Sequence, residues 1–153
     1  MRLALYQPDQ GGNVGAVLRL GACLRVGIDI VRPCGFALSD RSLRRSAMDY
    51  VADVAVHDDW AAFRAVASGR IALLTTKGAT TIHDFAFEAG DTLLMGSESA
   101  GVPEAVHGSV AAAVRIPIAE GARSLNLAVA AGIALGEALR QTQAWPRRGA
   151  WPR

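Results

Sequence analysis

Residues 3–31 read LALYQPDQGGNVGAVLRLGACLRVGIDIV, and this stretch decides the fold. It contains two short apolar runs, Leu3–Tyr6 and Ile28–Val31, of the kind found in strands that are buried on both faces. Between these runs, apolar residues recur at helical spacing over 14–26, and Gly27 is a residue type that commonly ends a helix. The stretch therefore predicts a strand, a helix and a second strand parallel to the first.

The same alternation continues along the chain. Further apolar runs predict strands at 54–56, 71–74, 92–95 and 110–116. The expected helix starts are Asp40, Asp58 or Asp59, Pro103 and Ser124, the last opening a long helix over 125–141. This pattern predicts a single α/β domain with a mostly parallel sheet over residues 1–142, followed by a basic Trp/Pro/Arg extension over 143–153.

The composition is that of one globular domain, with 51% hydrophobic and 20% charged residues and two cysteines, which excludes a disordered chain and a disulfide-stapled scaffold. The net charge of +2 conceals two basic ends: residues 1–50 hold 7 basic and 4 acidic side chains, residues 51–139 hold 5 and 10, and residues 140–153 hold 4 and none. This distribution permits a polyanionic partner without requiring one.

No export signal opens the chain, and its longest mostly apolar run, 124–136, is shorter than the roughly 18 residues of a membrane helix. We therefore expect a cytoplasmic protein without membrane contact.

Three loops follow an expected strand and precede an expected helix, at 9–15, 96–103 and 115–126. In parallel sheets, ligands bind beyond the carboxyl ends of the strands. The glycines in these loops would let the backbone approach a ligand closely, and a helix start offers free N–H groups. Any one loop taken alone could be no more than a tight turn.

Other site classes find no support in the sequence. Neither G-x-G-x-x-G nor G-x-x-x-x-G-K-[ST] occurs, so both common phosphate-binding motifs are absent. No G-x-S-x-G of a serine hydrolase is found. We expect no metal, because the histidines and cysteines are scattered without ligand spacing: His57, His83, His107, Cys23 and Cys34.

Several separated motifs occur together: Leu5-Tyr6-Gln7-Pro8, Gly12-Asn13-Val14-Gly15 with Arg19, Leu43-Arg44-Arg45, Asp49-Tyr50, Leu74-Thr75-Thr76-Lys77-Gly78, Gly96-Ser97-Glu98, Gly101-Val102-Pro103, Arg115-Ile116-Pro117 and Arg123-Ser124-Leu125-Asn126-Leu127. In this order and spacing they resemble the motifs of the SPOUT superfamily of knotted RNA methyltransferases. Within it, the chain is most similar to the minimal tRNA (cytidine/uridine) wobble-nucleotide 2′-O-methyltransferases, over residues 2–142.

The resemblance implies a parallel sheet with a trefoil knot near the C-terminus, formed by segments 74–78, 96–103 and 115–126. It implies that these segments bind S-adenosylmethionine and release S-adenosylhomocysteine. The positions that match the family's cofactor contacts are Leu74, Gly96, Ile116 and Ser124, with Gly101 and Leu125 as further contacts.

The resemblance also implies catalytic positions. Arg19 matches the arginine of the first motif, and Asn13, Glu98 and Asn126 match polar residues of the three motifs. A guanidinium stays charged at neutral pH, so we expect Arg19 to bind the phosphate or the developing alkoxide rather than to accept the proton. Asn13 could fix Arg19 or the ribose, and Asn126 and Ser124 could orient the nucleotide and the cofactor. Glu98 could hold a loop or an arginine rather than act as the base.

The expected partner is the anticodon loop of tRNA, with methylation at the wobble position. Arg41, Arg44 and Arg45 could share a helical face that contacts RNA, although a solvated face is an equal alternative. Because the chain is short and the family's members are homodimers, we expect a homodimer; small residues of the last helix would allow close approach or equally suit internal packing: Ala128, Ala131, Gly132 and Gly136. The alternatives left open are 2′-O-methylation of rRNA or of another tRNA position, and a non-catalytic RNA-binding protein on the same fold.

Overall fold

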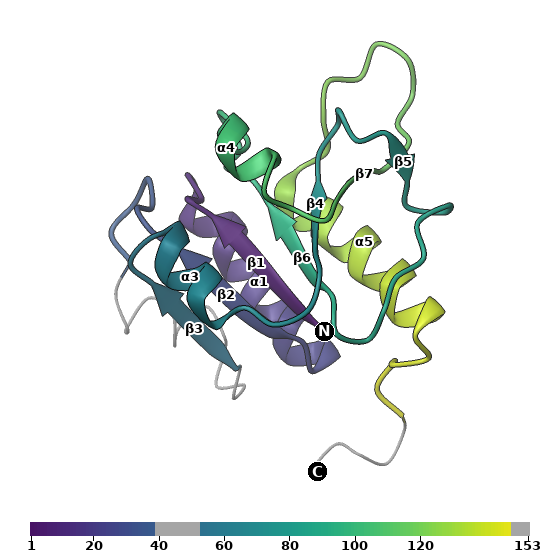
Figure 1. Ribbon diagram of the computed structural model, residues 1–153, viewed down its shortest axis with the longest axis horizontal. Helices are drawn as coiled ribbons and strands as arrows, with labels where there is room; N and C mark the ends of the chain where they lie inside the picture. Colours follow the sequence, from purple (N-terminus) through teal and green to yellow (C-terminus); the bar gives the residue numbers. More distant parts are fainter. Residues whose placement is uncertain (39–52, 148–153) are drawn as a thin grey trace.

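A computed structural model describes residues 1–38 and 53–147 of the chain, which form a seven-stranded sheet of order β3-β2-β1-β6-β4-β7-β5 (Figure 1). Every neighbouring pair of strands is parallel. The strands are β1 (Arg2–Tyr6), β2 (Gly27–Val31), β3 (Val54–His57), β4 (Ile71–Leu74), β5 (Thr80–Thr81), β6 (Thr92–Met95) and β7 (Ala112–Arg115). The predicted parallel α/β architecture is confirmed, and the two-residue β5 is an addition to it.

Helices cover both faces of the sheet, which explains why its strands are apolar on both sides. The side chains of Leu3 and Leu5 pack in the cluster beneath α1 (Gly11–Leu24) and α5 (Leu127–Gln141). Those of Ala4 and Tyr6 point to the other face, toward α3 (Trp60–Val66) and α4 (Glu104–His107). Figure 1 shows α1 and α5 side by side behind the sheet.

Two helix boundaries near the N-terminus can be compared with the sequence. Asp59 caps α3 as predicted, because its carboxylate accepts a hydrogen bond of 2.7 Å from the N–H of Ala62. The prediction that Gly27 ends the first helix is wrong: α1 ends earlier, at Leu24, and its C-cap is Arg25, which has a φ of 56°. Gly27 instead begins β2, where an added Cβ would collide with the guanidinium of Arg2.

The start of α5 also differs from the prediction. Ser124 is not the cap; the cap is Asn126, whose side-chain oxygen accepts hydrogen bonds from the N–H groups of Ala128 and Val129. Because the helix starts two residues later than expected, Ser124 and Leu125 belong to the preceding loop. Their side chains are thereby available to line a cavity rather than to support a helix.

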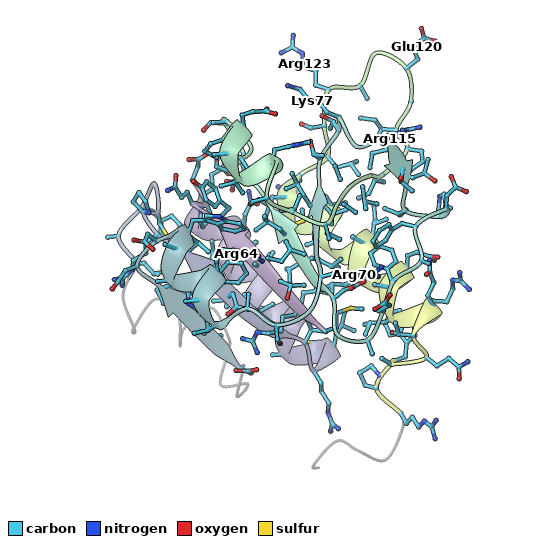
Figure 2. All side chains as sticks on the ribbon, in the orientation of Figure 1. Arg64, Arg70, Lys77, Arg115, Glu120 and Arg123 are labelled. Carbon is cyan, nitrogen blue, oxygen red and sulfur yellow. The ribbon has the colours of Figure 1, made fainter. Side chains whose placement is uncertain are left out.

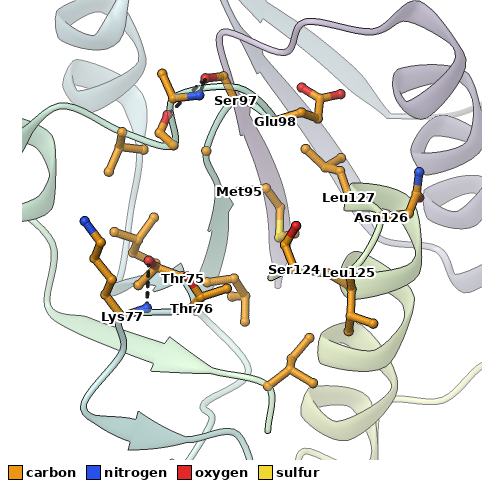
Figure 3. A pocket seen from close by; sticks show the side chains of 18 of the residues that line it. Thr75, Thr76, Lys77, Met95, Ser97, Glu98, Ser124, Leu125, Asn126 and Leu127 are labelled. Atoms are coloured by element: carbon orange, nitrogen blue, oxygen red, sulfur yellow. Dashed lines mark hydrogen bonds between the residues drawn. The ribbon is translucent and has the colours of Figure 1, made fainter. Parts of the chain in front are cut away.

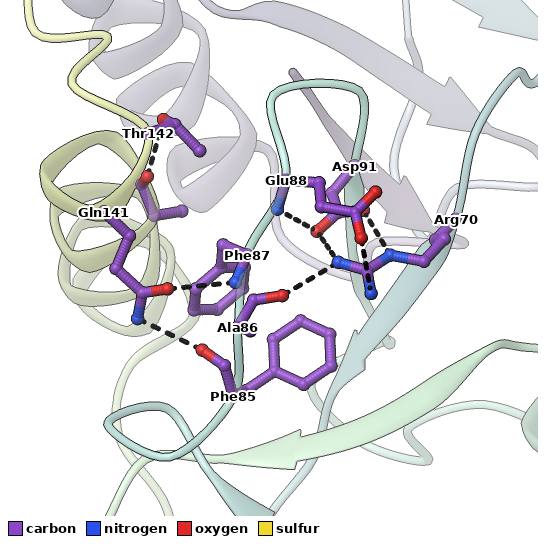
Figure 4. Close-up of polar contacts among 9 residues, drawn as sticks. Arg70, Phe85, Ala86, Phe87, Glu88, Asp91, Gln141 and Thr142 are labelled. Carbon is purple, nitrogen blue, oxygen red and sulfur yellow. Dashed lines mark hydrogen bonds and ion pairs between the residues drawn. The ribbon is translucent and has the colours of Figure 1, made fainter.

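The end of α5 is fastened to the segment between β5 and β6 (Figure 4). The side-chain amide of Gln141 accepts a hydrogen bond from the N–H of Phe87 at 2.9 Å and donates one to the carbonyl of Phe85 at 3.1 Å. Beside it, Arg70 binds the almost fully buried Asp91 at 2.8 Å. The hydrogen bonds of Gln141 anchor the helix whose opposite end reaches the candidate site.

Several predictions lie outside the described residues: the helix capped by Asp40, the candidate RNA contacts Arg41, Arg44 and Arg45, and the last six residues of the extension. None of the helices in the described ranges combines the length and the apolar character that a membrane span requires.

Candidate functional site

A cavity of about 710 Å³ opens at the carboxyl edge of the sheet (Figure 3). It lies where β6 stands between β1 and β4, so that loops far apart in the sequence meet. Parallel sheets commonly bind ligands at such a point, because the chain leaves neighbouring strands in opposite directions there. The walls come from segments 73–77, 95–102, 116–118 and 124–130, together with Gln10 and Asn13 at the start of α1.

The three loops identified in the sequence meet at this cavity. Residues from all three loops line it. So does every position that the family resemblance matched to the cofactor, including Leu74 at the end of β4: Leu74, Gly96, Gly101, Ile116, Ser124 and Leu125. Figure 3 shows Ser124 and Leu125 opposite the segment that carries Thr75, Thr76 and Lys77. The structure therefore brings the predicted contacts together, and the role of each stays a prediction.

The second loop begins with a turn that requires glycine. The N–H of Ser97 donates to the carbonyl of Gly101, and the N–H of Gly101 donates to the carbonyl of Ser97, both at 2.9 Å. Gly101 has a φ of 69°, which favours glycine. A Cβ on Gly96 would lie 2.6 Å from the carbonyl carbon of Gly101. The turn therefore exposes bare backbone at the cavity wall.

Three polar side chains, one from each loop, are joined by two hydrogen bonds at the same cavity. The Nδ2 of Asn13 donates to Oε1 of Glu98 at 2.8 Å, and the Nδ2 of Asn126 donates to Oδ1 of Asn13 at 2.9 Å. All three residues line the cavity, and Asn13 is buried. The structure thus places three of the four predicted catalytic residues in direct contact.

Arg19, the fourth predicted catalytic residue, lies away from these three side chains. It is exposed on α1, almost two helical turns beyond Asn13, and does not line the cavity. Within the part of the chain that the structure describes, its side chain makes no hydrogen bond or ion pair. An arginine so placed is available to a partner that approaches from outside.

Asp9 had no role in the sequence-based predictions, yet it joins the first two loops. Its carboxylate accepts a hydrogen bond of 2.8 Å from the N–H of Ser99, and its own N–H donates to Oε2 of Glu98 at 2.8 Å. The hydrogen bond from Ser99 lowers the pKa of the Asp9 carboxyl below its usual value. The signal available in the sequence was an acidic residue at the entry of the first glycine-rich loop.

Other charged or titratable side chains line the cavity without a predicted role. Lys77 comes from the loop after β4, and Glu104 and His107 come from α4. Lys77 lies within a matched motif, so its position in the loop was foreseeable. Glu104 and His107 lie outside the matched motifs and reach the cavity because α4 follows the second loop directly.

Residues 1–136 match the family model described as SpoU rRNA Methylase family. The chain belongs to this family. Among its relatives, a tRNA (cytidine(34)-2′-O)-methyltransferase of Beijerinckia indica is 54% identical over 147 residues, which cover 93% of this chain and 92% of that protein.

Solved structures of SpoU-type enzymes share the fold. One, described as structural insights into the 2-OH methylation of C/U34 on tRNA, has a TM-score of 0.84 at 40% identity and covers 92% of this chain and 94% of its own. An AdoMet-bound rRNA methyltransferase of Sinorhizobium meliloti has a TM-score of 0.79 at 28% identity, covering 91% of this chain and 55% of that one. The resemblance inferred from the separated motifs is thus confirmed at the level of the family, and the trefoil knot stays a prediction.

Proposed function

We propose that this SpoU-family protein methylates the ribose 2′-oxygen of the wobble nucleotide of tRNA, at position 34, in the cytoplasm. The observation that carries the proposal is the meeting of Asn13, Glu98 and Asn126 beside the loop residues that line one cavity. The similarity to a tRNA (cytidine(34)-2′-O)-methyltransferase over 92% of its length supports the choice of substrate. Cytidine or a modified uridine is the proposed nucleotide.

The cavity suits S-adenosylmethionine in size and lining. Its volume of about 710 Å³ is within the roughly 300–1,000 Å³ typical of small-molecule sites. Leu74, Ile116 and Leu125 offer apolar surface to the adenine ring, Ser124 offers a hydroxyl, and the backbone at Gly96 allows close approach. When bound, the cofactor supplies an electrophilic methyl group and is released as S-adenosylhomocysteine.

The chain's own residues position the ribose and manage its charge. Asn13 and Asn126 bind the ribose from inside the cavity, and Glu98 holds Asn13 in place. Arg19 binds the adjacent phosphate or the oxygen as it gains charge, since a guanidinium has a pKa above about 12 and does not accept the proton. Water or another group takes the proton, and neither a metal ion nor a covalent enzyme intermediate is required.

Basic side chains near the cavity suit an RNA partner. Figure 2 shows Lys77 and Arg123 projecting at the end of the molecule that carries the cavity loops, and both side chains are exposed. We assign them to phosphates of the anticodon loop, where bases are unpaired and the backbone is accessible. Arg41, Arg44 and Arg45 are proposed as further RNA contacts.

The test is to map 2′-O-methylation of tRNA from cells with and without the gene. We expect the wobble methyl group to disappear when the gene is deleted and to return when the wild-type gene is supplied. A gene that encodes Arg19→Ala should not restore it. A full wobble methyl signal in the deletion strain would contradict the proposal. Loss of a methyl group from rRNA or from another tRNA position would transfer the activity to that substrate.

The proposed enzyme is a homodimer joined through α1 and α5. On α5, the apolar side chains of Val129 and Ile133 stay 52% and 41% exposed, and Leu125 in the loop before the helix is 37% exposed. Gly132 lies beside Leu20 of α1, so the two helices form one surface. A second copy would cover this surface and bring the exposed Arg19 to the interface. Of the small residues considered from the sequence, Ala131 is fully buried and packs internally.

We expect Ile133→Glu to convert the dimer to a monomer, because each interface would have to bury two carboxylates without partners. Sedimentation velocity at micromolar concentration measures this directly. Val66→Glu is the matched control, since Val66 is 68% exposed on α3, on the other face of the sheet. A wild-type protein that sediments as a monomer, or an Ile133→Glu variant that stays dimeric, would contradict the interface.

A further inference from the structure

A chain of hydrogen bonds runs from the second loop through α1 to the start of α5. Glu98 accepts from Asn13, Asn13 accepts from Asn126, and the side-chain oxygen of Asn126 accepts from backbone N–H groups of α5. The two side-chain bonds measure 2.8 and 2.9 Å, and the bond from the N–H of Ala128 measures 3.0 Å. Each side chain in this hydrogen-bonded series therefore contacts the next. Asn13 is 85 residues from Glu98 in the sequence and 113 residues from Asn126.

Both ends of this chain fix its direction. An ionised carboxylate has only acceptors, so the amide of Asn13 must turn its NH2 group toward Glu98. Its oxygen then faces Asn126, which must present its own NH2 group in turn. At the other end, the N–H groups of α5 require the oxygen of Asn126. The amide orientations of Asn13 and Asn126 are therefore dictated by chemistry and are not interchangeable.

This direction determines what the cavity offers to a ligand. Each amide nitrogen carries two hydrogens, and among the described residues each uses one of them in the chain. Asn13 and Asn126 both line the cavity, so each has one N–H left for a ligand. Reversal of the amides would present carbonyl oxygens instead, which repel an oxygen that is gaining negative charge.

We propose that Glu98 is a positioning residue that orients the amides of Asn13 and Asn126 so that both donate hydrogen bonds to the ribose oxygen. This rests on the proposed function, because it needs a hydroxyl that becomes an oxyanion during the reaction. Donors held in place before the reaction stabilise such a charge without reorganisation.

Asp9 holds the Glu98 carboxylate in this role. Its N–H occupies Oε2 while Asn13 occupies Oε1, so both carboxylate oxygens are engaged and the group cannot rotate freely. The bond from the N–H of Ser99 to the Asp9 carboxylate fixes the loop residue next to Glu98. A carboxylate bound at both oxygens is held in one orientation, as an anchor for the Asn13 amide requires.

Glu98→Gln tests the proposal with almost no change of shape. The N–H of Asp9 can only donate, so the new amide turns its oxygen there and its NH2 group toward Asn13, which reverses that amide. We expect kcat to fall on the order of 10²-fold, the effect of losing oriented donors. The KM for tRNA, the affinity for S-adenosylhomocysteine by calorimetry and the melting temperature should stay close to wild type.

Asn126→Asp provides a second variant that separates the cap from the donor. Aspartate caps a helix as well as asparagine does, so α5 keeps its start, but a carboxylate has no N–H to give. The same loss of kcat is expected, with only a small loss of stability from the missing hydrogen bond between Asn126 and Asn13. Asp59→Asn is the matched control, because it exchanges carboxylate for amide at a cap remote from the cavity.

The outcomes separate this inference from the proposed function. If the wild type methylates tRNA and either variant keeps kcat within threefold, the positioning role is wrong and the proposed function stands. If kcat falls only together with S-adenosylhomocysteine affinity and melting temperature in both variants, the residues are structural and the inference is again wrong. If the wild type leaves tRNA unmethylated, the proposed function is wrong and the role that rests on it falls too.

Discussion

Arg19→Ala is expected to lower the single-turnover rate of tRNA methylation by about 10²- to 10³-fold, the usual effect of removing one group that stabilises charge in the transition state. The guanidinium is permanently charged, and it offers a planar fork of donors to a phosphate or to the ribose oxygen. The measurement is methyl transfer from S-adenosylmethionine to purified tRNA with enzyme in excess, which isolates the methyl-transfer step from product release.

The fold and the cofactor site should be unaffected by this substitution. Arg19 is exposed, and within the described part of the chain it has no ion pair or hydrogen bond to lose. Surface substitutions of this kind usually change stability by less than about 0.5 kcal/mol. Because Arg19 does not line the cavity, the affinity for S-adenosylhomocysteine in calorimetry should match that of the wild type.

Two further variants test whether the guanidinium group of Arg19, rather than any positive charge on the surface, is responsible. Arg19→Lys keeps the charge but loses the fork, so an intermediate rate is expected if two oxygens are bound at once. Arg140→Ala is the control, because Arg140 is an exposed helical arginine that pairs with Glu137 at the far end of α5. Near-normal single-turnover methylation by Arg19→Ala would reject its catalytic assignment.

Much of the fold was predictable because parallel strands buried on both faces are continuous apolar runs. Six of the seven strands follow from such runs, and β1 shows why: its residues alternate between the α1 and α3 faces, yet both faces are covered. β5 was missed because two threonines carry no periodicity.

The helix ends were less predictable, because the residue types that cap helices also serve other purposes. Gly27 is a residue type typical of a helix end, but in the structure it begins β2. There its lack of a side chain leaves room for Arg2 of the neighbouring strand β1. Ser124 reads as a cap, but Asn126, two residues later, makes the capping bonds. In each case the local sequence pointed to one residue, and contacts within the folded protein placed the helix end at another.

The site residues were predictable as motifs, but their connections were not. Asn13, Glu98 and Asn126 were expected from three separate loops, and nothing in their spacing indicates which atoms meet. Their contacts join residues 85 and 113 positions apart and depend on the order of β1, β6 and β4 in the sheet. Asp9 was missed for the same reason, since its role is defined by Ser99 and Glu98 across the sheet edge.

Asp29→Ala is expected to lower the free energy of unfolding by about 3 kcal/mol, the lower part of the range for breaking a buried ion pair. Asp29 is the one charged residue in the apolar strand β2, and it is only 4% exposed at the middle of that strand. It accepts a hydrogen bond from Nε of Arg2 at 2.6 Å, and Nε2 of His57 lies 2.8 Å from its other oxygen. Urea unfolding measures the loss.

The size of this effect follows from what the substitution leaves behind. Without the carboxylate, the His57 side chain, only 11% exposed, loses its partner and cannot recover it fully from water. Arg2 is 35% exposed and keeps Asp53 at 2.6 Å, which restrains the loss. Asp29→Asn keeps an acceptor of the same shape, so its loss should be smaller and would measure the part due to charge.

Asp53→Ala is the decisive control, because it removes the other partner of the same guanidinium. Asp53 is 72% exposed, so its ion pair should contribute less than about 1 kcal/mol. Asp29 shares its side of β2 with Val31, in the cluster beneath α3, and does not line the cavity. The folded fraction of Asp29→Ala should therefore methylate at the wild-type rate. Equal losses of stability for Asp29→Ala and Asp53→Ala would mean that burial of this carboxylate contributes nothing beyond a surface ion pair.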